Sequence, residues 1–259
     1  MLRPRIIACL LVRDNGLVKT VKFKDDKYVG DPINAVKIFN EKEADELMVL
    51  DIDATLRRRE PNYRLISQFA AESRMPLCYG GGVASVSQAT QIIGLGVEKV
   101  ALSTAAINKP RLVAEIAQEV GSQSVVVVLD VRRHARGGWD VHLGSGRVST
   151  GRDVIDASLE AEANGAGEIV INSVDCDGVM QGYDIELACE VRNRVQVPLT
   201  ILGGAGSHAD IVELLKACGV VGAAAGSLFV FKGVYRAVLI NYPTATQKAE
   251  ILRMSGFLR

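Results

Sequence analysis

The strongest constraint on the fold is a regular alternation of short apolar runs with amphipathic segments. Each run spans four to eight residues and is nearly continuous, as expected of strands buried on both faces of a parallel sheet. The runs are Ile6–Leu11, Leu47–Ile52, Pro76–Tyr79, Val100–Ser103, Ser124–Val131, Ile169–Val174, Pro198–Leu202 and Gly222–Ala225. The segments with helical spacing between them are Ile33–Glu43, Tyr63–Ser73, Val86–Leu95, Arg111–Val120, Asp153–Asn164, Ile185–Arg194 and His208–Cys218. This alternation predicts one parallel α/β sheet.

Chain length and an internal repeat favour closing that sheet into a barrel. Eight strand–helix units in 259 residues are typical of a (β/α)8 TIM barrel, and an open doubly wound sheet is the alternative. Tyr79–Ala106 and Leu202–Phe229 share the order of glycine cluster, amphipathic helix, small-residue strand and serine-containing turn. Asp45 and Gly167 begin a second matching pair, so the repeat spans about 123 residues. We therefore expect a single barrel over residues 1–259, with half-barrels at roughly 1–121 and 122–250.

Charge and cysteine usage exclude several classes of protein. Thirty basic and thirty acidic side chains give zero formal net charge, which argues against a nucleic-acid or membrane surface. The five cysteines form no Cys-x-x-Cys pair and the three histidines are far apart, so we expect reduced thiols and neither a metal nor a cofactor. The first apolar run is too short to span a membrane, and no cleavage site follows it. These features predict a cytoplasmic protein.

Two glycine clusters at the ends of predicted strands indicate anion binding. Glycine-rich turns bring backbone N–H groups close to a ligand, and in a barrel such turns lie on the catalytic face. The first candidate phosphate site comprises Gly81, Gly82, Ser103 and Thr104. The second comprises Asp177, Gly178, Gly203, Gly204, Gly226 and Ser227. A purely conformational role of the glycines is the alternative, but two repeated clusters predict a ligand with a phosphate at each end.

Several motifs spread over nearly the whole chain carry a resemblance to a known family. They are RIIACL from Arg5, GDP from Gly30, DELMVLDI from Asp45, YGGGV from Tyr79, VEKV from Val97, GSQSVVVVLD from Gly121, GAGEI from Gly165, DCDGVMQGYD from Asp175 and GGAG from Gly203. On these residues the chain resembles the cyclase subunit of imidazole glycerol phosphate synthase. The resemblance implies a glutaminase subunit whose ammonia travels through the barrel. At the catalytic face the ammonia would attack a bis-phosphorylated ribulosyl nucleotide, giving imidazole glycerol phosphate and an aminoimidazole carboxamide nucleotide.

The resemblance also implies two catalytic aspartates, of which this chain keeps one. Asp130 ends the fifth predicted strand and matches one of them, whereas Leu11 replaces the other at the end of the first strand. Leucine can neither donate nor accept a proton, and loss of one acid–base group commonly removes about 10²–10⁴-fold in rate. Asp14 or Lys19, in the segment after the first strand, could substitute.

Other departures from the family lie near the same end of the barrel. Asp53 stands where the family has a hydroxyl residue, and Leu202 stands where a small polar residue is usual. We expect both to face the ligand and to change the charge and size of its pocket. The long loop after the first strand could close over an anion, or it could be a charge-balanced solvated loop with Asp25 and Asp26. Its lysines are Lys19, Lys22, Lys24 and Lys27.

Four charged residues stand immediately before strands at the opposite end of the barrel. They are Arg5, Glu46, Lys99 and Glu168. Two cations and two anions there can close a ring of ion pairs, and charges on this face usually concern stability. They match the ammonia gate of the resembled family residue for residue, so we predict an ammonia entrance. The resemblance further places Asp45, Glu98 and Gln123 at the rim where a glutaminase docks.

A complete entrance and an incomplete proton-transfer pair lead to three hypotheses. The first is a barrel that conducts ammonia from a glutaminase to an acceptor other than the usual one. Leu11 and the motif EPNY (Glu60–Tyr63) resemble second copies of the subunit near surface-polysaccharide genes, which implies sugar amidation and a sugar amidotransferase as a further partner. The second is an active histidine-biosynthesis cyclase that uses Asp130 with a surrogate group. The third is a non-catalytic barrel that activates the glutaminase when a phosphorylated ligand binds.

Overall fold

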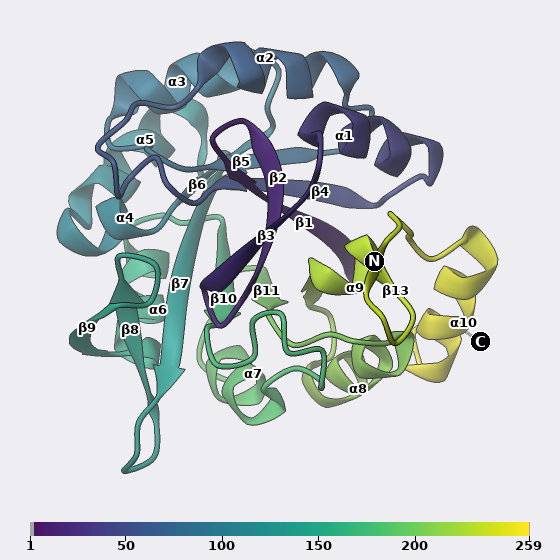
Figure 1. The fold of residues 1–259 in the computed structure, drawn as a ribbon. Helices are drawn as coiled ribbons and strands as arrows, with labels where there is room; N and C mark the ends of the chain where they lie inside the picture. Colours follow the sequence, from purple (N-terminus) through teal and green to yellow (C-terminus); the bar gives the residue numbers. More distant parts are fainter. Residues whose placement is uncertain (1–2, 259) are drawn as a thin grey trace.

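Eight parallel strands close into a ring at the centre of the protein, in a computed structural model that describes residues 3–258. Each strand of the ring is hydrogen-bonded to the next, and the last pairs with the first. In chain order these strands are β1 (Arg5–Arg13), β4 (Glu46–Asp51), β5 (Leu77–Gly80), β6 (Lys99–Leu102), β7 (Val125–Arg133), β10 (Glu168–Ser173), β11 (Leu199–Leu202) and β12 (Gly222–Ala225). Figure 1 shows helices arranged around this ring. The predicted (β/α)8 barrel is confirmed.

Helices cover the outside of the ring between successive strands. The longer ones are α1 (Pro32–Glu41), α2 (Tyr63–Glu72), α3 (Val86–Gly94), α5 (Arg111–Val120), α6 (Val154–Ala163), α7 (Ile185–Arg192), α8 (His208–Cys218) and α10 (Ala245–Met254). The short ones are α4 (Thr104–Asn108), the 3₁₀ helix η1 (Ser122–Ser124) and α9 (Ser227–Val230). Side-chain caps fix several starts: Asp31 accepts from the N–H of Asn34 at α1, and Ser207 forms a capping box with Asp210 at α8. None of the helices within residues 3–258 is long and apolar enough to cross a membrane.

Three antiparallel hairpins extend the barrel at its rim. They are β2 (Gly16–Val21) with β3 (Lys24–Gly30), β8 (Trp139–Leu143) with β9 (Val148–Asp153), and β13 (Phe231–Lys232) with β14 (Ala237–Val238). The lysine-rich segment after the first strand is therefore a hairpin, and the expectation of a loop is wrong. The physical reason is that β1 continues past the ring to Arg13, and β2 pairs with its free edge. Figure 1 shows this hairpin crossing the mouth of the barrel.

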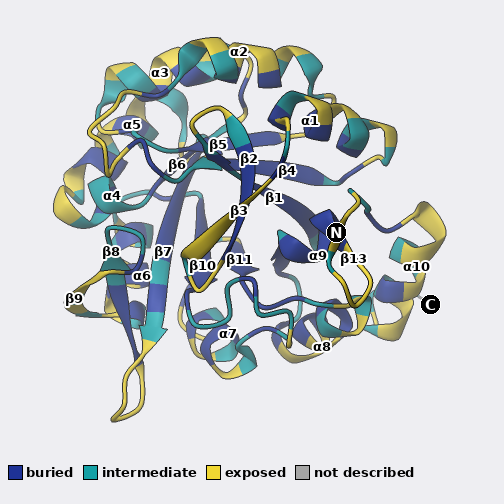
Figure 2. Ribbon diagram, viewed as in Figure 1, coloured by how far each residue is buried: buried dark blue, intermediate teal, exposed yellow. Residues whose placement is uncertain are grey.

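The buried residues, dark blue in Figure 2, form an inner core and an outer one. Successive residues of β1 alternate between them, because Ile7 and Cys9 point into the ring while Ala8 and Leu10 pack against the helices. The inner core consists of Ile7, Cys9, Met48, Cys78, Ala101, Val126, Val128, Val170, Leu202 and Ala224, with Leu11 and Leu50 packed against it. Mostly small and medium apolar side chains thus fill the barrel between its two polar ends.

Candidate functional site

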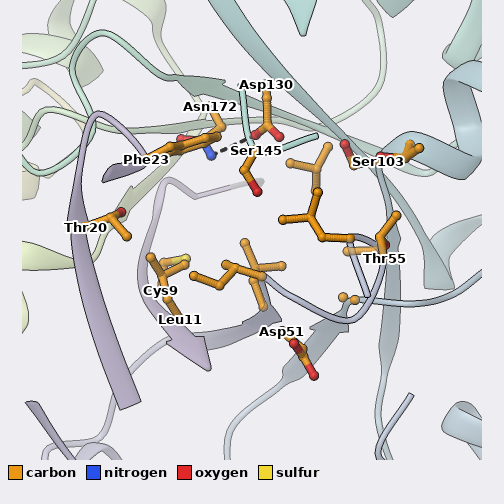
Figure 3. Close-up of a pocket in the computed structure, with 18 of the residues that line it drawn as sticks. Cys9, Leu11, Thr20, Phe23, Asp51, Thr55, Ser103, Asp130, Ser145 and Asn172 are labelled. Atoms are coloured by element: carbon orange, nitrogen blue, oxygen red, sulfur yellow. Dashed lines mark hydrogen bonds between the residues drawn. The ribbon is translucent and has the colours of Figure 1, made fainter. Parts of the chain in front are cut away.

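A cavity of about 540 Å³ opens at the carboxyl ends of the barrel strands. Its wall contains all ten residues of the two predicted phosphate sites. Asp130, Lys19 and Leu11 lie in the same wall. Strand ends as far apart in sequence as Leu11 and Ser227, which are separated by 216 positions, therefore meet at one place, as parallel topology requires. The wall also contains Thr55 and Ser145, which the sequence did not single out (Figure 3).

Two glycines occupy equivalent turns in the two halves of the barrel. Gly81 has a φ of +126° and Gly203 a φ of +99°. A Cβ atom at Gly81 would lie 2.6 Å from the carbonyl oxygen of Asp51, and one at Gly203 would lie 2.7 Å from that of Ser173. Each turn thus passes against the end of the preceding strand, where only glycine fits. Conformation alone accounts for these two glycines, and the role of the turns in phosphate binding stays a prediction.

Two short helices begin at the cavity, one in each half. Thr104 starts α4 and Ser227 starts α9, and both residues lie in the cavity wall. Among the described residues, no side chain caps either helix. The first-turn N–H groups therefore remain available to an anion in the cavity. This arrangement is chemically suited to the predicted phosphates.

Asp130 lies in the carboxyl-terminal half of β7 with its carboxyl group toward the cavity. The side-chain N–H of Asn172 donates to its Oδ1 at 3.0 Å (Figure 3). Burial raises the pKa of Asp130 to about 7, against the lowering effect of the Asn172 hydrogen bond, and the nearby Asp177 charge raises it further. The Oδ1 of Asn172 is buried and has no hydrogen-bond partner in the described part of the chain. A carboxyl group that titrates near neutrality can both accept and donate a proton.

Apolar side chains occupy the opposite side of the cavity. Figure 3 shows Cys9 and Leu11 across from Asp130 and Asn172. Leu202 lies in the same wall, and that it faces a ligand stays a prediction. The position that would hold the second catalytic aspartate therefore presents a hydrocarbon surface.

Asp14 lies outside the cavity wall and is exposed. Its carboxylate pairs with Arg57 at 2.7 Å and with Arg59 at 3.2 Å. Slight desolvation works in the opposite direction, but these two hydrogen bonds lower the pKa of Asp14. A low pKa and a position away from the ligand both disfavour it as a surrogate acid–base group.

Asp53 is buried and is also outside the cavity wall. Its carboxylate pairs with Arg13 at 3.0 Å and with Arg57 at 2.7 Å. The expectation that Asp53 faces the ligand is therefore wrong, because the two guanidinium groups draw it into the junction between β1 and the loop after β4. Arg13 also pairs with Asp26 at 2.5 Å, which fastens the β2–β3 hairpin to the same junction.

Lys19 and Asp177 hold that hairpin over the cavity from the other side. Lys19 is buried, and its Nζ donates to the carbonyl oxygen of Cys9 at 2.7 Å. Burial lowers the pKa of Lys19, while the charges of Cys9 and Asp177 work against that change. Asp177 accepts hydrogen bonds from the Thr20 hydroxyl at 2.7 Å and from the Phe23 N–H at 3.1 Å. Its carboxylate is thus engaged by the hairpin, a role that the sequence did not indicate.

The other three lysines of the segment do not line the cavity. Lys22, Lys24 and Lys27 are exposed and are absent from the wall of the cavity. These three lysines face solvent, as the alternative in the sequence analysis expected. Of the lysines in this hairpin, only Lys19 can contribute a positive charge to an anion bound in the cavity.

The four predicted gate residues meet as a closed ring at the other end of the barrel. Each is the first residue of its strand: Arg5 of β1, Glu46 of β4, Lys99 of β6 and Glu168 of β10. Arg5 contacts Glu46 at 2.5 Å and Glu168 at 2.7 Å. Lys99 contacts Glu46 at 2.7 Å and Glu168 at 2.8 Å. Each carboxylate therefore touches both cations at the amino-terminal end of the barrel, and a gating role of the ring stays a prediction.

Electrostatics reinforce this ring. Burial alone would raise the pKa of Glu168, but the hydrogen bonds and charges of Arg5 and Lys99 lower it. The carboxylates likewise raise the pKa of Lys99 against the effect of burial. The Thr200 hydroxyl donates to Glu168 at 2.6 Å and adds a fifth member that the sequence did not reveal. Glu168 and Lys99 are thus held in their ionised forms.

Two of the three predicted rim residues form hydrogen bonds with other residues of the same barrel. Asp45 accepts from the N–H of Ile6 at 3.0 Å and from Lys248 at 2.8 Å. Glu98 accepts from the N–H of Leu77 at 2.7 Å, whereas Gln123 is exposed. These acids order the ends of strands around the entrance, and docking at this rim stays a prediction. Within residues 3–258, no group of three or more His, Cys, Asp or Glu side chains could hold a metal ion.

Comparison with known proteins identifies the family. The family described as "Histidine biosynthesis protein" matches residues 5–236. A Vibrio vulnificus relative named "Putative imidazole glycerol phosphate synthase subunit hisF3" is 53% identical over 255 residues, covering 98% of each chain. A hisF2-named relative from Pseudomonas aeruginosa is 51% identical over 243 residues, covering 94% of this chain and 97% of its own. "Imidazole glycerol phosphate synthase subunit HisF" of Streptococcus sanguinis is 39% identical over 229 residues, covering 88% and 91% respectively. The chain therefore belongs to the histidine biosynthesis protein family, as a barrel of the HisF cyclase-subunit type.

Proposed function

We propose that this barrel receives ammonia from a glutaminase and passes it to an acceptor other than the usual ribulosyl nucleotide. The observation that carries the proposal is the contrast between a complete ionic ring at one end and Leu11 opposite Asp130 at the other. A synthase of the ordinary kind needs both an entrance and an acid–base pair. This chain keeps the residues of the entrance and one of the two acid–base groups.

The ring and the barrel interior suit neutral ammonia better than ammonium. An ammonium ion would lose its hydration among the apolar side chains of the inner core, and nothing there would replace it. Ammonia carries no such penalty. Lys99 and Arg5 would move aside to admit it, because both are more exposed than the two carboxylates that anchor the ring. The glutaminase would dock at the rim around these residues.

The cavity would hold a bis-phosphorylated ligand across the two halves. One phosphate would lie at Gly81, Gly82, Ser103 and Thr104, and the other at Gly178, Gly203, Gly204, Gly226 and Ser227. Lys19 would lie beside the second phosphate. Asp177 would contribute indirectly, since its carboxylate is already bonded to the β2–β3 hairpin.

Asp130 would be the one proton-transfer group. Near neutral pH it can take a proton from attacking ammonia and return it to a leaving oxygen on the same side of the ligand. It cannot also serve the opposite side, where Leu11 lies. This favours an amidation that needs one proton relay, such as amide or amidine formation on a sugar with the help of a sugar amidotransferase. The relatives whose names number them as second or third copies are consistent with such a divergence.

Genetic complementation tests the proposal. We expect the gene to leave a strain without its cyclase dependent on added histidine, because Leu11 removes half of the acid–base pair. Complementation by the unmodified gene would overturn the proposal and indicate an active cyclase. The pKa of Asp130, which is raised to about 7, is the observation that favours this alternative. A complex that hydrolyses glutamine but releases all its ammonia to solvent would instead indicate a barrel that only activates its glutaminase.

A further inference from the structure

Two cysteines of neighbouring helices lie with their sulfur atoms close together. Cys189 belongs to α7 and Cys218 is the last residue of α8. Their Sγ atoms are 3.4 Å apart. Cys218 is buried and Cys189 is half-buried, so one thiol is protected while the other can be reached from solvent. Neither residue lies in the cavity wall or the ionic ring, so nothing in the proposed function uses them.

We propose that Cys189 and Cys218 form a redox-active dithiol, which a small-molecule disulfide converts into a covalent cross-link between α7 and α8. This would be a modification site on the outer surface of the barrel. It is independent of the proposed function, because it requires neither ammonia nor a phosphorylated ligand.

The local geometry permits the bond to form. A disulfide has a sulfur–sulfur length of about 2.05 Å, so the two atoms must approach by about 1.4 Å. Cys218 ends its helix, and the next residue, Gly219, has a φ of +75° with no atom near the place where a Cβ would lie. A residue at a helix end is held by fewer backbone hydrogen bonds than one within the helix, so Cys218 can adjust more readily than a residue in the middle of α8. Helix α7 provides the fixed side of the pair.

The reaction proceeds in two exchange steps. The Cys189 thiolate attacks one sulfur of oxidised glutathione, forming a mixed disulfide and releasing one glutathione thiolate. Cys218 then gives up its proton and attacks the Cys189 sulfur, and the second glutathione leaves. Two protein thiols are oxidised and one glutathione disulfide is reduced to two thiols, so electrons and protons balance. Burial and the neighbouring Cys189 thiol raise the pKa of Cys218 to about 12, while the Arg192 charge works against this increase. The second step is thus the slow one.

Peptide mapping after oxidation tests the proposal. The full-length protein is incubated with excess oxidised glutathione, digested, and analysed without reduction. We expect one peptide pair joined through Cys189 and Cys218, about 2 Da lighter than the two free peptides together and separated by dithiothreitol. The cross-link closes a loop of the chain and should raise the Tm by roughly 5–10 °C.

Single substitutions distinguish this dithiol from ordinary surface thiols. In Cys218→Ser the reaction should stop at the mixed disulfide on Cys189, and in Cys189→Ser it should not reach Cys218. Cys176→Ser is the matched control, because Cys176 is also half-buried but lies in another part of the fold, and it should cross-link as the unmodified protein does. The proposal is overturned if the unmodified protein also stops at the mixed disulfide, or if neither thiol reacts in the folded state.

Discussion

The two ends of the barrel bury charge in opposite ways. At the entrance, every carboxylate touches two cations, and the pKa of Glu168 is lowered although the residue is buried. At the cavity, Asp130 is hydrogen-bonded to a neutral amide, and burial raises its pKa to about 7. Burial acts in the same direction at both ends, so the partners decide the outcome. The ionic ring satisfies its own charges, whereas the cavity contains a carboxyl group whose charge depends on what binds beside it.

Restoring a carboxylate at position 11 should produce the largest change of all, and it should appear in the rate of cyclisation at the cavity. We expect Leu11→Asp to raise cyclisation of the bis-phosphorylated nucleotide by about 10²–10⁴-fold over the unmodified chain, since it returns a second acid–base group to the cavity. The rate is measured with glutaminase present. Leu11→Asn provides the control, because it has nearly the same shape and no titratable proton. Equal rates for the two variants would show that proton transfer is not what the chain lacks.

Breaking the ring at the entrance should destabilise the fold strongly. Glu46→Gln removes one charge and leaves Arg5 and Lys99 with a single shared carboxylate. We expect a loss of about 3 kcal/mol in the free energy of unfolding, measured by urea denaturation. Glu190→Gln, an exposed change of the same chemistry on α7, should alter it by less than about 0.5 kcal/mol. Similar losses in both variants would mean that the ring contributes nothing specific.

Asp130 should make stability fall as pH rises. Its pKa is about 7 in the folded protein and about 4 in an unfolded chain, so between these values the folded state holds a proton that the unfolded state has lost. Its contribution is therefore fully present below about pH 4, is lost progressively as pH rises toward 7 and is constant above that. We compare the free energy of unfolding of Asp130→Asn with that of the unmodified protein at two pH values. On going from pH 4.5 to pH 8, we expect this difference to shift in favour of the variant by about 2 kcal/mol. A difference that does not change with pH would place the pKa of Asp130 near its ordinary value.

The ion pairs near Leu11 should matter least. Asp53→Asn weakens the pairs with Arg13 and Arg57, both of which are partly exposed, so we expect a loss of about 1 kcal/mol in the free energy of unfolding. Asp26→Asn removes only the outer pair with Arg13 and should cost about half as much. If Asp53→Asn instead changed ligand affinity and left stability intact, Asp53 would belong to the cavity after all.

The sequence predicted the barrel well because apolar runs and amphipathic segments alternate regularly along the chain. Every strand of the ring lies within about two residues of its expected bounds, since continuous apolar runs can be satisfied only in the barrel wall. The β2–β3 hairpin was missed although its pairing with β1 is local, and the contact that holds it over the cavity, between Phe23 and Asp177, joins residues far apart in the sequence. The boundaries of the two half-barrels stay a prediction.

In the candidate site, too, some residues could be placed from the sequence and others could not. Gly81 and Gly203, which directly follow strands, and Asp130, in the second half of β7, could be placed from the topology alone. Asp53 could not, because its direction depends on two guanidinium groups from other segments. Thr200 and Asn172 were missed because a hydroxyl or an amide within an apolar strand gives no sign of its partner in sequence.

The central claim is that the entrance is intact while the usual chemistry at the cavity is lost. Its most direct test is to combine the purified chain with its glutaminase, glutamine and the bis-phosphorylated nucleotide, and to measure imidazole glycerol phosphate. We predict glutamine hydrolysis without detectable cyclisation by the unmodified chain. Sustained formation of imidazole glycerol phosphate, at a rate similar to that of Leu11→Asp, would contradict the claim.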